Sequence, residues 1–210
     1  HTFGHPCNIH ELLAVAHDYK LKMVEDAAES LGSFYDDRHT GTFGLLGIIS
    51  FNGNKLLTTG GGGAILTNNE NIANHIKHLT TTAKISHPWN YVHDEIGYNF
   101  RMPNINAALG CAQLEKINTF LSSKRRLYYR YENVFNKIKN VKLMAEPINC
   151  KSNYWLQTLI LSEKMAYQKD DVLKVTNDIG LSTRPSWTLI NKLKPYNLCQ
   201  NAPLPIAESL

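Results

Sequence analysis

Several common sequence features are missing from this chain of 210 residues, and each absence excludes a class of protein. No apolar run approaches the ~20 residues that a membrane-spanning helix needs, and no basic-then-apolar leader stands at the start. Basic residues form no long block, the densest being the three at 124–126, so we expect no nucleic-acid partner and no membrane surface. The chain has no internal repeat and no low-complexity tract.

Cysteine is scarce and widely spaced, and no CxxC pair occurs. We therefore expect free thiols in a reducing compartment and a cytoplasmic protein. The histidines match no metal-binding spacing such as HExxH, so no metal site is expected. The glycine run 60–63 fits neither GxGxxG nor a Walker A loop, because no Lys-Ser/Thr pair follows it. The four cysteines are Cys7, Cys111, Cys150 and Cys199.

The composition that remains is that of a folded protein, with 43% apolar residues, 19% charged residues and a net charge of +4. The chain has no initiator methionine and stops in what reads as the start of a helix. We therefore expect it to be cut at both ends from a longer protein.

Hydrophobic patterns predict an α/β architecture in the first half of the chain. Helical spacing is found over 8–19 and 69–82, and short buried strands over 21–28, 45–51 and 63–68. The segment 83–104 reads as a long irregular loop, which is usually functional in a compact domain. A helical pattern of roughly 30 residues starts at Pro103 and Asn104 and breaks near Asn118.

The last 70 residues follow another pattern, a small α+β unit. It comprises predicted strands over 141–147, 153–161 and 181–187, and a helix over 169–180. We expect three parts: residues 1–117 as part of a large domain, 118–140 as a linking helix, and 141–210 as an incomplete small domain.

Polar residues follow the predicted strands where ligands bind in open α/β sheets. Asp26 ends one strand, Ser50 ends the next with Asn52 and Lys55 just after it, and a third strand follows the glycine run. We expect all of them near one edge of a parallel sheet. A pyridoxal enzyme needs such a set: a lysine for an imine, a carboxylate for the pyridine nitrogen, and hydroxyl and amide groups for the phosphate.

Each of these signals is weak when taken alone. A lysine after a strand is most often a solvated surface residue. Asp26 could instead cap the next turn or helix, and its neighbour Glu25 reads as a surface or capping acid.

The combination is more specific than its parts. The blocks VEDAAESLGSFY, GTFGLLGIISFNGNKLLTTGGGGAILTN and GYNFRMPNINAALGCAQLEKI resemble, in order and spacing, the DegT/StrS-type sugar aminotransferases. The resemblance covers about residues 1–205, and HLTTTAK favours the branch that acts on UDP-linked 4-keto-6-deoxy-N-acetylhexosamines in legionaminic-acid-like and bacillosamine-like pathways. It implies the C-terminal part of an aspartate-aminotransferase-like large domain, with a mostly parallel sheet, and then a small α+β domain.

The resemblance also implies a role for each matching position. Lys55 is the Schiff-base lysine and proton shuttle, and Asp26 is the partner of the pyridine nitrogen. Glu29 stands near the ring, where many members have His or Gln and perosamine-synthase-like ones have Glu. The remaining assignments are Ser50 and Asn52 near the phosphate, Asn99 as a phosphate ligand in the neighbouring subunit's site, and Arg101 and Trp187 near the substrate.

The implied activity is a ping-pong transamination with pyridoxal 5'-phosphate as cofactor, glutamate as amino donor and a nucleotide-linked keto sugar as acceptor. A homodimer with shared active sites is expected.

Asn191 replaces an expected His, which leaves the substrate contacts of 184–196 open. Without the missing half, we expect the 210 residues to bind the cofactor poorly. The alternative is a truncated, inactive fragment that only packs against another chain; a dehydratase, which would replace the lysine by His, is disfavoured by Lys55.

Overall fold

The computed structural model describes residues 1–209, which form two units. The first unit comprises residues 1–132 and 145–158, and the second comprises 133–144 and the described residues from 159 on. The predicted division at 117 and 140 stays a prediction. The first unit contains η1 (Thr2–Gly4), α1 (Ile9–Asp18), β1 (Val24–Asp26), β2 (Phe34–Tyr35), β3 (Arg38–His39), β4 (Leu46–Ser50), β5 (Gly63–Leu66), α2 (Glu70–Thr80), α3 (Asn104–Leu114), β7 (Cys150–Lys151) and most of α4 (Ile117–Phe135).

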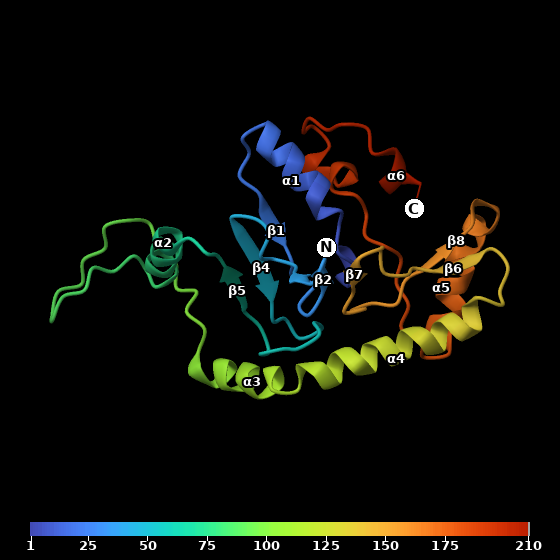
Figure 1. Cartoon of the computed structure of the whole chain (residues 1–210), viewed down its shortest axis with the longest axis horizontal. Coiled ribbons are helices and arrows are strands. Elements are labelled where there is room, and N and C mark those ends of the chain that lie inside the picture. The colour runs from blue at the N-terminus through green and yellow to red at the C-terminus, as the bar shows by residue number, and fades with distance from the viewer. Residues whose placement is uncertain (210) are drawn as a thin grey trace. The chain divides into compact units, whose positions relative to one another are not determined.

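The central sheet of the first unit has the strand order β1-β4-β5 (Figure 1). β1 and β4 are parallel, with Asp26 opposite Ile48, whereas β5 is antiparallel to β4, with Gly63 opposite Ser50. The predicted α/β class is confirmed, with one correction: the described sheet is mixed rather than mostly parallel. The antiparallel direction of β5 places the glycine run before it at the carboxyl ends of β1 and β4, where it was expected.

Two close backbone approaches require glycine in this sheet. A Cβ at Gly47 would lie 1.9 Å from the carbonyl oxygen of Gly41, and a Cβ at Gly63 would lie 2.5 Å from that of Ile49. Ile49 is buried, as are Ala27 and Leu57. The loop before β4 therefore approaches β4 at Gly47, and β4 approaches β5 at Gly63, more closely than any larger residue permits.

A second sheet, of order β3-β2-β7, was missed by the sequence analysis. Its hairpin turns through Asp36 and Asp37 at φ +44° and +59°, a two-residue loop between the paired Tyr35 and Arg38. Two consecutive positive φ values fit the twist of a tight hairpin, and aspartate tolerates them better than most residues. The strands are only two residues long, too short to show a strand period in the sequence.

The predicted helices are confirmed, with small shifts at their ends. α1 and α2 lie within the predicted ranges 8–19 and 69–82, and the Asn69 side chain caps α2 by accepting a hydrogen bond from the Ile72 N–H at 3.1 Å. The long pattern divides into α3 and α4 at residues 115–116, slightly before the break expected near Asn118. No helix among the described residues has the length and apolar character to cross a membrane.

The second unit is built on an antiparallel pair, β6 (Val141–Leu143) with β8 (Leu159–Leu161). The predicted strand 153–161 is therefore wrong in its first half, and residues 181–187 form no strand, although α5 confirms the predicted helix. Pro185 cannot donate a ladder hydrogen bond, which disfavours a strand there. The other elements are η2 (Glu163–Gln168), α5 (Lys169–Asp178), η3 (Ile190–Lys192), η4 (Lys194–Tyr196) and α6 (Pro205–Glu208).

Candidate functional site

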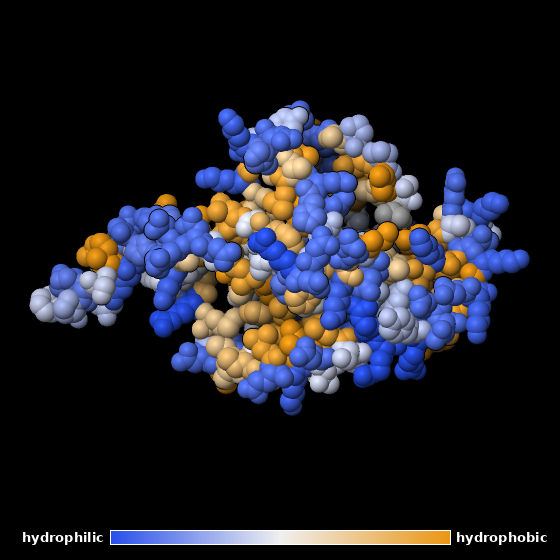
Figure 2. Space-filling model, viewed as in Figure 1, coloured by the Kyte–Doolittle hydropathy of each residue, from blue (hydrophilic) through white to orange (hydrophobic). Residues whose placement is uncertain are grey.

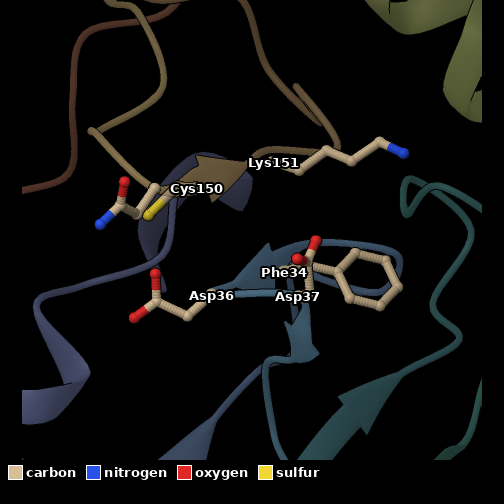
Figure 3. Close-up of a pocket in the computed structure, with 6 residues that line it drawn as sticks. Phe34, Asp36, Asp37, Cys150 and Lys151 are labelled. Carbon is tan, nitrogen blue, oxygen red and sulfur yellow. The ribbon is translucent and has the colours of Figure 1, made fainter.

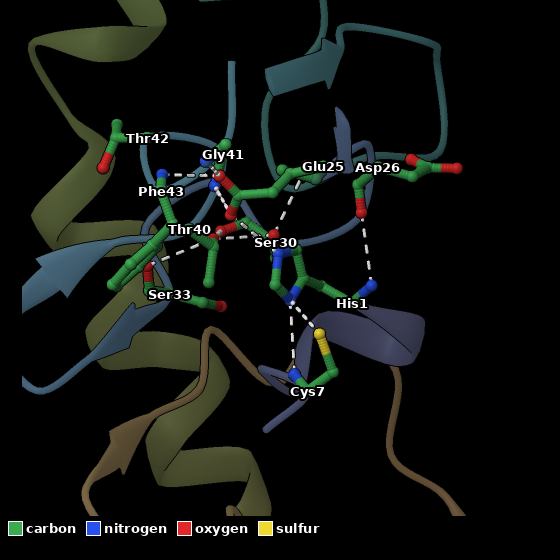
Figure 4. Close-up of polar contacts among 12 residues, drawn as sticks. His1, Cys7, Glu25, Asp26, Ser30, Ser33, Thr40, Gly41, Thr42 and Phe43 are labelled. Carbon is green, nitrogen blue, oxygen red and sulfur yellow. Dashed lines mark hydrogen bonds and ion pairs between the residues drawn. The ribbon is translucent and has the colours of Figure 1, made fainter. Parts of the chain in front are cut away.

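Two neighbouring acids at the end of β1 have opposite environments. The Asp26 side chain is exposed, and its Oδ1 accepts a hydrogen bond from the Ala28 N–H at 3.1 Å. Glu25 is only 4% exposed, so the prediction of a surface or capping acid is wrong. Its carboxylate accepts hydrogen bonds from the backbone N–H groups of Gly41, Phe43 and Gly44 (Figure 4). Glu25 thus organises the loop before β4, and Asp26 is left facing outward at the sheet edge.

A buried histidine completes the surroundings of Glu25. His1 Nε2 lies 3.2 Å from Glu25 Oε2, and both side chains are 2% exposed. Burial lowers the pKa of His1, but its bonds to Cys7 and Glu25 together outweigh burial and raise the pKa to about 9. Burial likewise opposes ionisation of Glu25, yet hydrogen bonds from His1 and the loop N–H groups bring its pKa below the ordinary value. The two groups therefore form a charged, buried pair.

The loop after β4 carries three of the predicted residues. The Asn52 N–H donates to Ser50 Oγ at 3.3 Å, and the Lys55 N–H donates to the Asn52 carbonyl at 3.1 Å. The Asn52 side chain donates to Asn54 Oδ1 at 3.3 Å. These bonds hold Ser50, Asn52 and Lys55 in one turn at the carboxyl end of β4.

The Lys55 side chain extends toward two other segments of the first unit. Its Nζ lies 3.6 Å from Glu29 Oε1 and 4.2 Å from the centre of the Trp155 ring. The Lys55 and Glu29 side chains are 14% and 17% exposed, so the pair lies just below the surface. The sequence placed Glu29 near this site, but Trp155 was missed because it lies far along the chain and inside a predicted strand.

The glycine run is held by helix α3. Asn106 Nδ2 donates to the Thr59 carbonyl, and the Gln113 side chain bonds both the N–H and the carbonyl of Thr58, at 3.0 and 2.9 Å. Gly60 and Gly62 have φ of +82° and +89°, which favours glycine at both positions. Helix α3 thus fixes the backbone that leads into the glycine run.

The remaining predicted residues are Asn99, Arg101 and Trp187. Asn99 and Arg101 are exposed, and Asn99 forms an isolated bridge with Thr81 near the end of α2. Their segment also exposes Tyr91 (81%) and Ile96 (84%), and Figure 2 shows an apolar group on it beside the α2 region. Trp187 belongs to the second unit and is 58% exposed.

Two hollows of the first unit do not include Lys55. One, of about 410 Å³, is an apolar groove between α1 and β1 that reaches Asp26. The other, of about 260 Å³, is polar and lies at the β2–β3 turn (Figure 3). It is lined by Phe34, Asp36, Asp37, Asn149, Cys150 and Lys151. Neither hollow joins the set of groups expected for a pyridoxal site.

The chemistry of that set nevertheless fits pyridoxal 5'-phosphate. A partly buried primary amine, an exposed carboxylate and a partly buried hydroxyl come from Lys55, Asp26 and Ser50, and the parallel register puts the last two at one sheet edge. An amine can bind an aldehyde, a carboxylate can hold a protonated ring nitrogen, and a hydroxyl with nearby amides can bind phosphate.

Known proteins are similar to this chain over most or all of its length. Over all 210 residues, the chain is 34% identical to GDP-perosamine synthase of Escherichia coli O157:H7, covering 56% of that protein. It is 27% identical, over 86% of its length and 48% of the relative, to the UDP-4-amino-4,6-dideoxy-N-acetyl-beta-L-altrosamine transaminase of Campylobacter jejuni subsp. jejuni serotype O:23/36. The chain spans about half the length of the curated relatives it matches.

A solved structure shares the fold of this chain. The aminotransferase PseC of Helicobacter pylori, involved in the biosynthesis of pseudoaminic acid, superposes with a TM-score of 0.92 at 24% identity, covering 99% of this chain and 57% of PseC. The model of the DegT/DnrJ/EryC1/StrS aminotransferase family matches residues 1–210. This chain therefore belongs to the DegT/DnrJ/EryC1/StrS aminotransferase family.

Proposed function

We propose that this chain is part of an enzyme that transfers an amino group from glutamate to a nucleotide-linked 4-keto-6-deoxy sugar, with pyridoxal 5'-phosphate as cofactor. The observation that carries the proposal is the partly buried Lys55 amine, on the turn that leaves β4 beside the end of β1. In a family of sugar aminotransferases, such an amine is the group expected to react.

The proposal gives each residue of the turn a task. Lys55 binds the cofactor aldehyde and then carries protons, and Asp26 holds the ring nitrogen protonated. Ser50 and Asn52 bind phosphate, and Glu29 keeps the Lys55 amine near the ring. When bound, the cofactor supplies an electron sink for the carbon that loses its proton.

A second copy of the chain completes the proposed site. Asn99 lies on an exposed segment with large apolar side chains, a surface typical of protein–protein contacts. We infer a homodimer in which Asn99 reaches the phosphate of the neighbouring subunit and Arg101 lies near the substrate, with Trp187 as a further substrate contact. A cytoplasmic enzyme for surface-polysaccharide precursors fits this substrate.

The named relatives favour this function over the alternatives. They include perosamine synthases and a UDP-sugar transaminase, and none supports an inactive packing partner. Another relative is a dTDP-4-dehydro-2,6-dideoxy-D-glucose 3-dehydratase. Lys55 favours transamination over dehydration, because the amine can accept and return the proton that an amino-group transfer moves.

A substrate panel tests the proposal. The complete gene product is incubated with the cofactor, glutamate and GDP-, UDP- or dTDP-linked 4-keto-6-deoxy sugars, and 2-oxoglutarate is measured. We expect release with at least one sugar, its loss in Lys55→Ala, and its retention in Lys77→Ala, which changes an exposed lysine of α2. No release with any sugar would remove the sugar-aminotransferase assignment.

A further inference from the structure

The Lys55 amine contacts two side chains, Trp155 and Glu29, from distant parts of the chain. Lys55 Nζ lies over the indole face of Trp155, 4.2 Å from the ring centre, and 3.6 Å from Glu29 Oε1. A lysine side chain has four flexible carbons and many rotamers. Two contacts with its charged end, a ring face and an anion, restrict it to few of them.

Trp155 can hold the amine because it is itself fixed. It is 4% exposed, and its Nε1 donates a hydrogen bond to the Asn54 carbonyl at 2.7 Å. Its own carbonyl accepts a hydrogen bond from Lys124 Nζ at 2.9 Å. The indole is therefore tied directly to the residue before Lys55, so ring and amine keep their spacing if the turn moves.

Asn153 forms hydrogen bonds with both Trp155 and Glu29, the two residues that contact the Lys55 amine. Its Oδ1 accepts from the Trp155 N–H at 2.8 Å, and its Nδ2 donates to the Glu29 carbonyl at 2.8 Å. Asn153 is 1% exposed, and a Cβ at Gly4 would lie 1.9 Å from its Oδ1, so the amide has almost no room to move. One buried amide thus fixes the backbones of both residues that face the amine.

We propose that Trp155 and Asn153 are positioning residues for Lys55. The Trp155 face holds the amine from one side, and Asn153 sets the distance between that face and the Glu29 carboxylate. This inference rests on the function proposed above, because the contacts of Trp155 and Glu29 matter only if Lys55 reacts. Neither residue was expected from the sequence, since both lie about a hundred positions after Lys55.

The first test observes the contact without any cofactor. Lysines are reductively methylated with ¹³C-formaldehyde, which keeps their charge, and the Lys55 signal is assigned by its loss in Lys55→Arg. An indole face shifts protons above it upfield, so we expect Lys55 to lie upfield of the lysines that contact no ring. Lys84, whose Nζ lies 3.9 Å from the centre of the Tyr91 ring, is expected to be shifted as well and is left out of that reference group. The Lys55 shift disappears in Trp155→Leu, persists in Trp155→Phe, and is unchanged in Trp89→Leu, which alters a tryptophan that is 75% exposed. A wild-type Lys55 signal among those of the exposed lysines overturns the proposal, whether or not the Leu variant folds.

The second test measures how fast Lys55 reacts with the cofactor. The complete gene product is mixed with pyridoxal 5'-phosphate, trapped with borohydride at timed intervals, and the label on Lys55 is quantified by peptide mass spectrometry. We expect capture to slow on the order of tenfold in Trp155→Leu and Asn153→Ala, because misplacement of a reacting group slows its reaction. Trp155→Phe, which keeps a ring face, retains most of the rate, as does Tyr19→Leu, which alters a tyrosine after α1 that is 74% exposed.

The outcomes separate the two proposals. Absence of label on wild-type Lys55 contradicts the proposed function, and the methyl shift still decides whether the amine is held by Trp155. Wild-type capture rates in folded Trp155→Leu and Asn153→Ala, with circular dichroism unchanged, overturn the positioning role and leave the proposed function intact.

Discussion

Glu25 shows how much one buried side chain organises at the edge of the site. Its two oxygens serve three backbone N–H groups of the loop before β4 and the ring of His1. Without the carboxylate, these donors lie in a place that water does not reach easily.

We therefore expect Glu25→Gln to lower the free energy of unfolding by about 3 kcal/mol, because the amide removes a charge and sets an N–H group against backbone donors. The control is Glu115→Gln, on an exposed residue after α3, with an expected change within about 0.5 kcal/mol. Urea denaturation measures both. Equal midpoints for the two variants would show that the Glu25 bonds contribute nothing.

The same pair gives stability a dependence on pH. The Glu25 pKa is below its ordinary 4.5, so its contribution is present above pH 4.5 and lost as pH falls through the lower folded value. The His1 pKa is raised from 6.5 to about 9, so its contribution is complete below pH 6.5 and lost as pH rises through about 9. We expect the pair to stabilise the fold most between about pH 4.5 and pH 6.5, where both contributions are complete. In Glu25→Gln, the free energy of unfolding should depend less on pH both below and above this range. Parallel curves for wild type and variant would contradict this.

At this scale, the sequence predicts groups that react but not groups that hold them. Asp26, Ser50 and Lys55 follow strand ends, and their spacing is readable. Glu25 looks like Asp26 in the sequence, and only the register of the loop decides which acid is buried. Trp155 and Asn153 act through tertiary contacts across about a hundred residues, which no local pattern encodes.

Among the elements, β4 contains a glycine, Gly47, with no room for a side chain. We expect Gly47→Ala to lower the free energy of unfolding by about 3 kcal/mol, because its Cβ would meet the Gly41 carbonyl oxygen at 1.9 Å. Gly53→Ala is the matched control, since a Cβ there meets nothing within 4 Å, and its expected change is within about 1 kcal/mol. Thermal and urea unfolding compare the two. Similar losses would mean that the loop around Gly41 moves away to admit the methyl group.

Helices and buried strands were predictable because their apolar periods extend over enough residues to be read. The hairpin of β2 and β3 was not, because each strand has two residues and the turn is Asp-Asp rather than Asn-Gly. The first half of the predicted strand 153–161 has strand-like residues, but it forms a buried turn. There, side chains replace the ladder: Ser33 Oγ and Asn153 Oδ1 accept from the backbone N–H groups of Asn153 and Trp155.

At the scale of the whole molecule, the family to which the chain belongs and the chemistry of Lys55, Asp26 and Ser50 are compatible. The chain spans about half of its curated relatives, and Asn99 lies on an exposed segment with apolar neighbours. Both facts favour a catalytic centre that needs more protein than these residues to close. The proposed function nevertheless depends on one atom of this chain, Lys55 Nζ.

The most direct test is therefore the absorbance of the complete gene product mixed with pyridoxal 5'-phosphate. We predict a band near about 410–430 nm, as expected for a protonated imine of this cofactor, which disappears in Lys55→Ala and persists in Lys77→Ala. A band of equal strength in Lys55→Ala, or no band in the wild type, would contradict the assignment of Lys55.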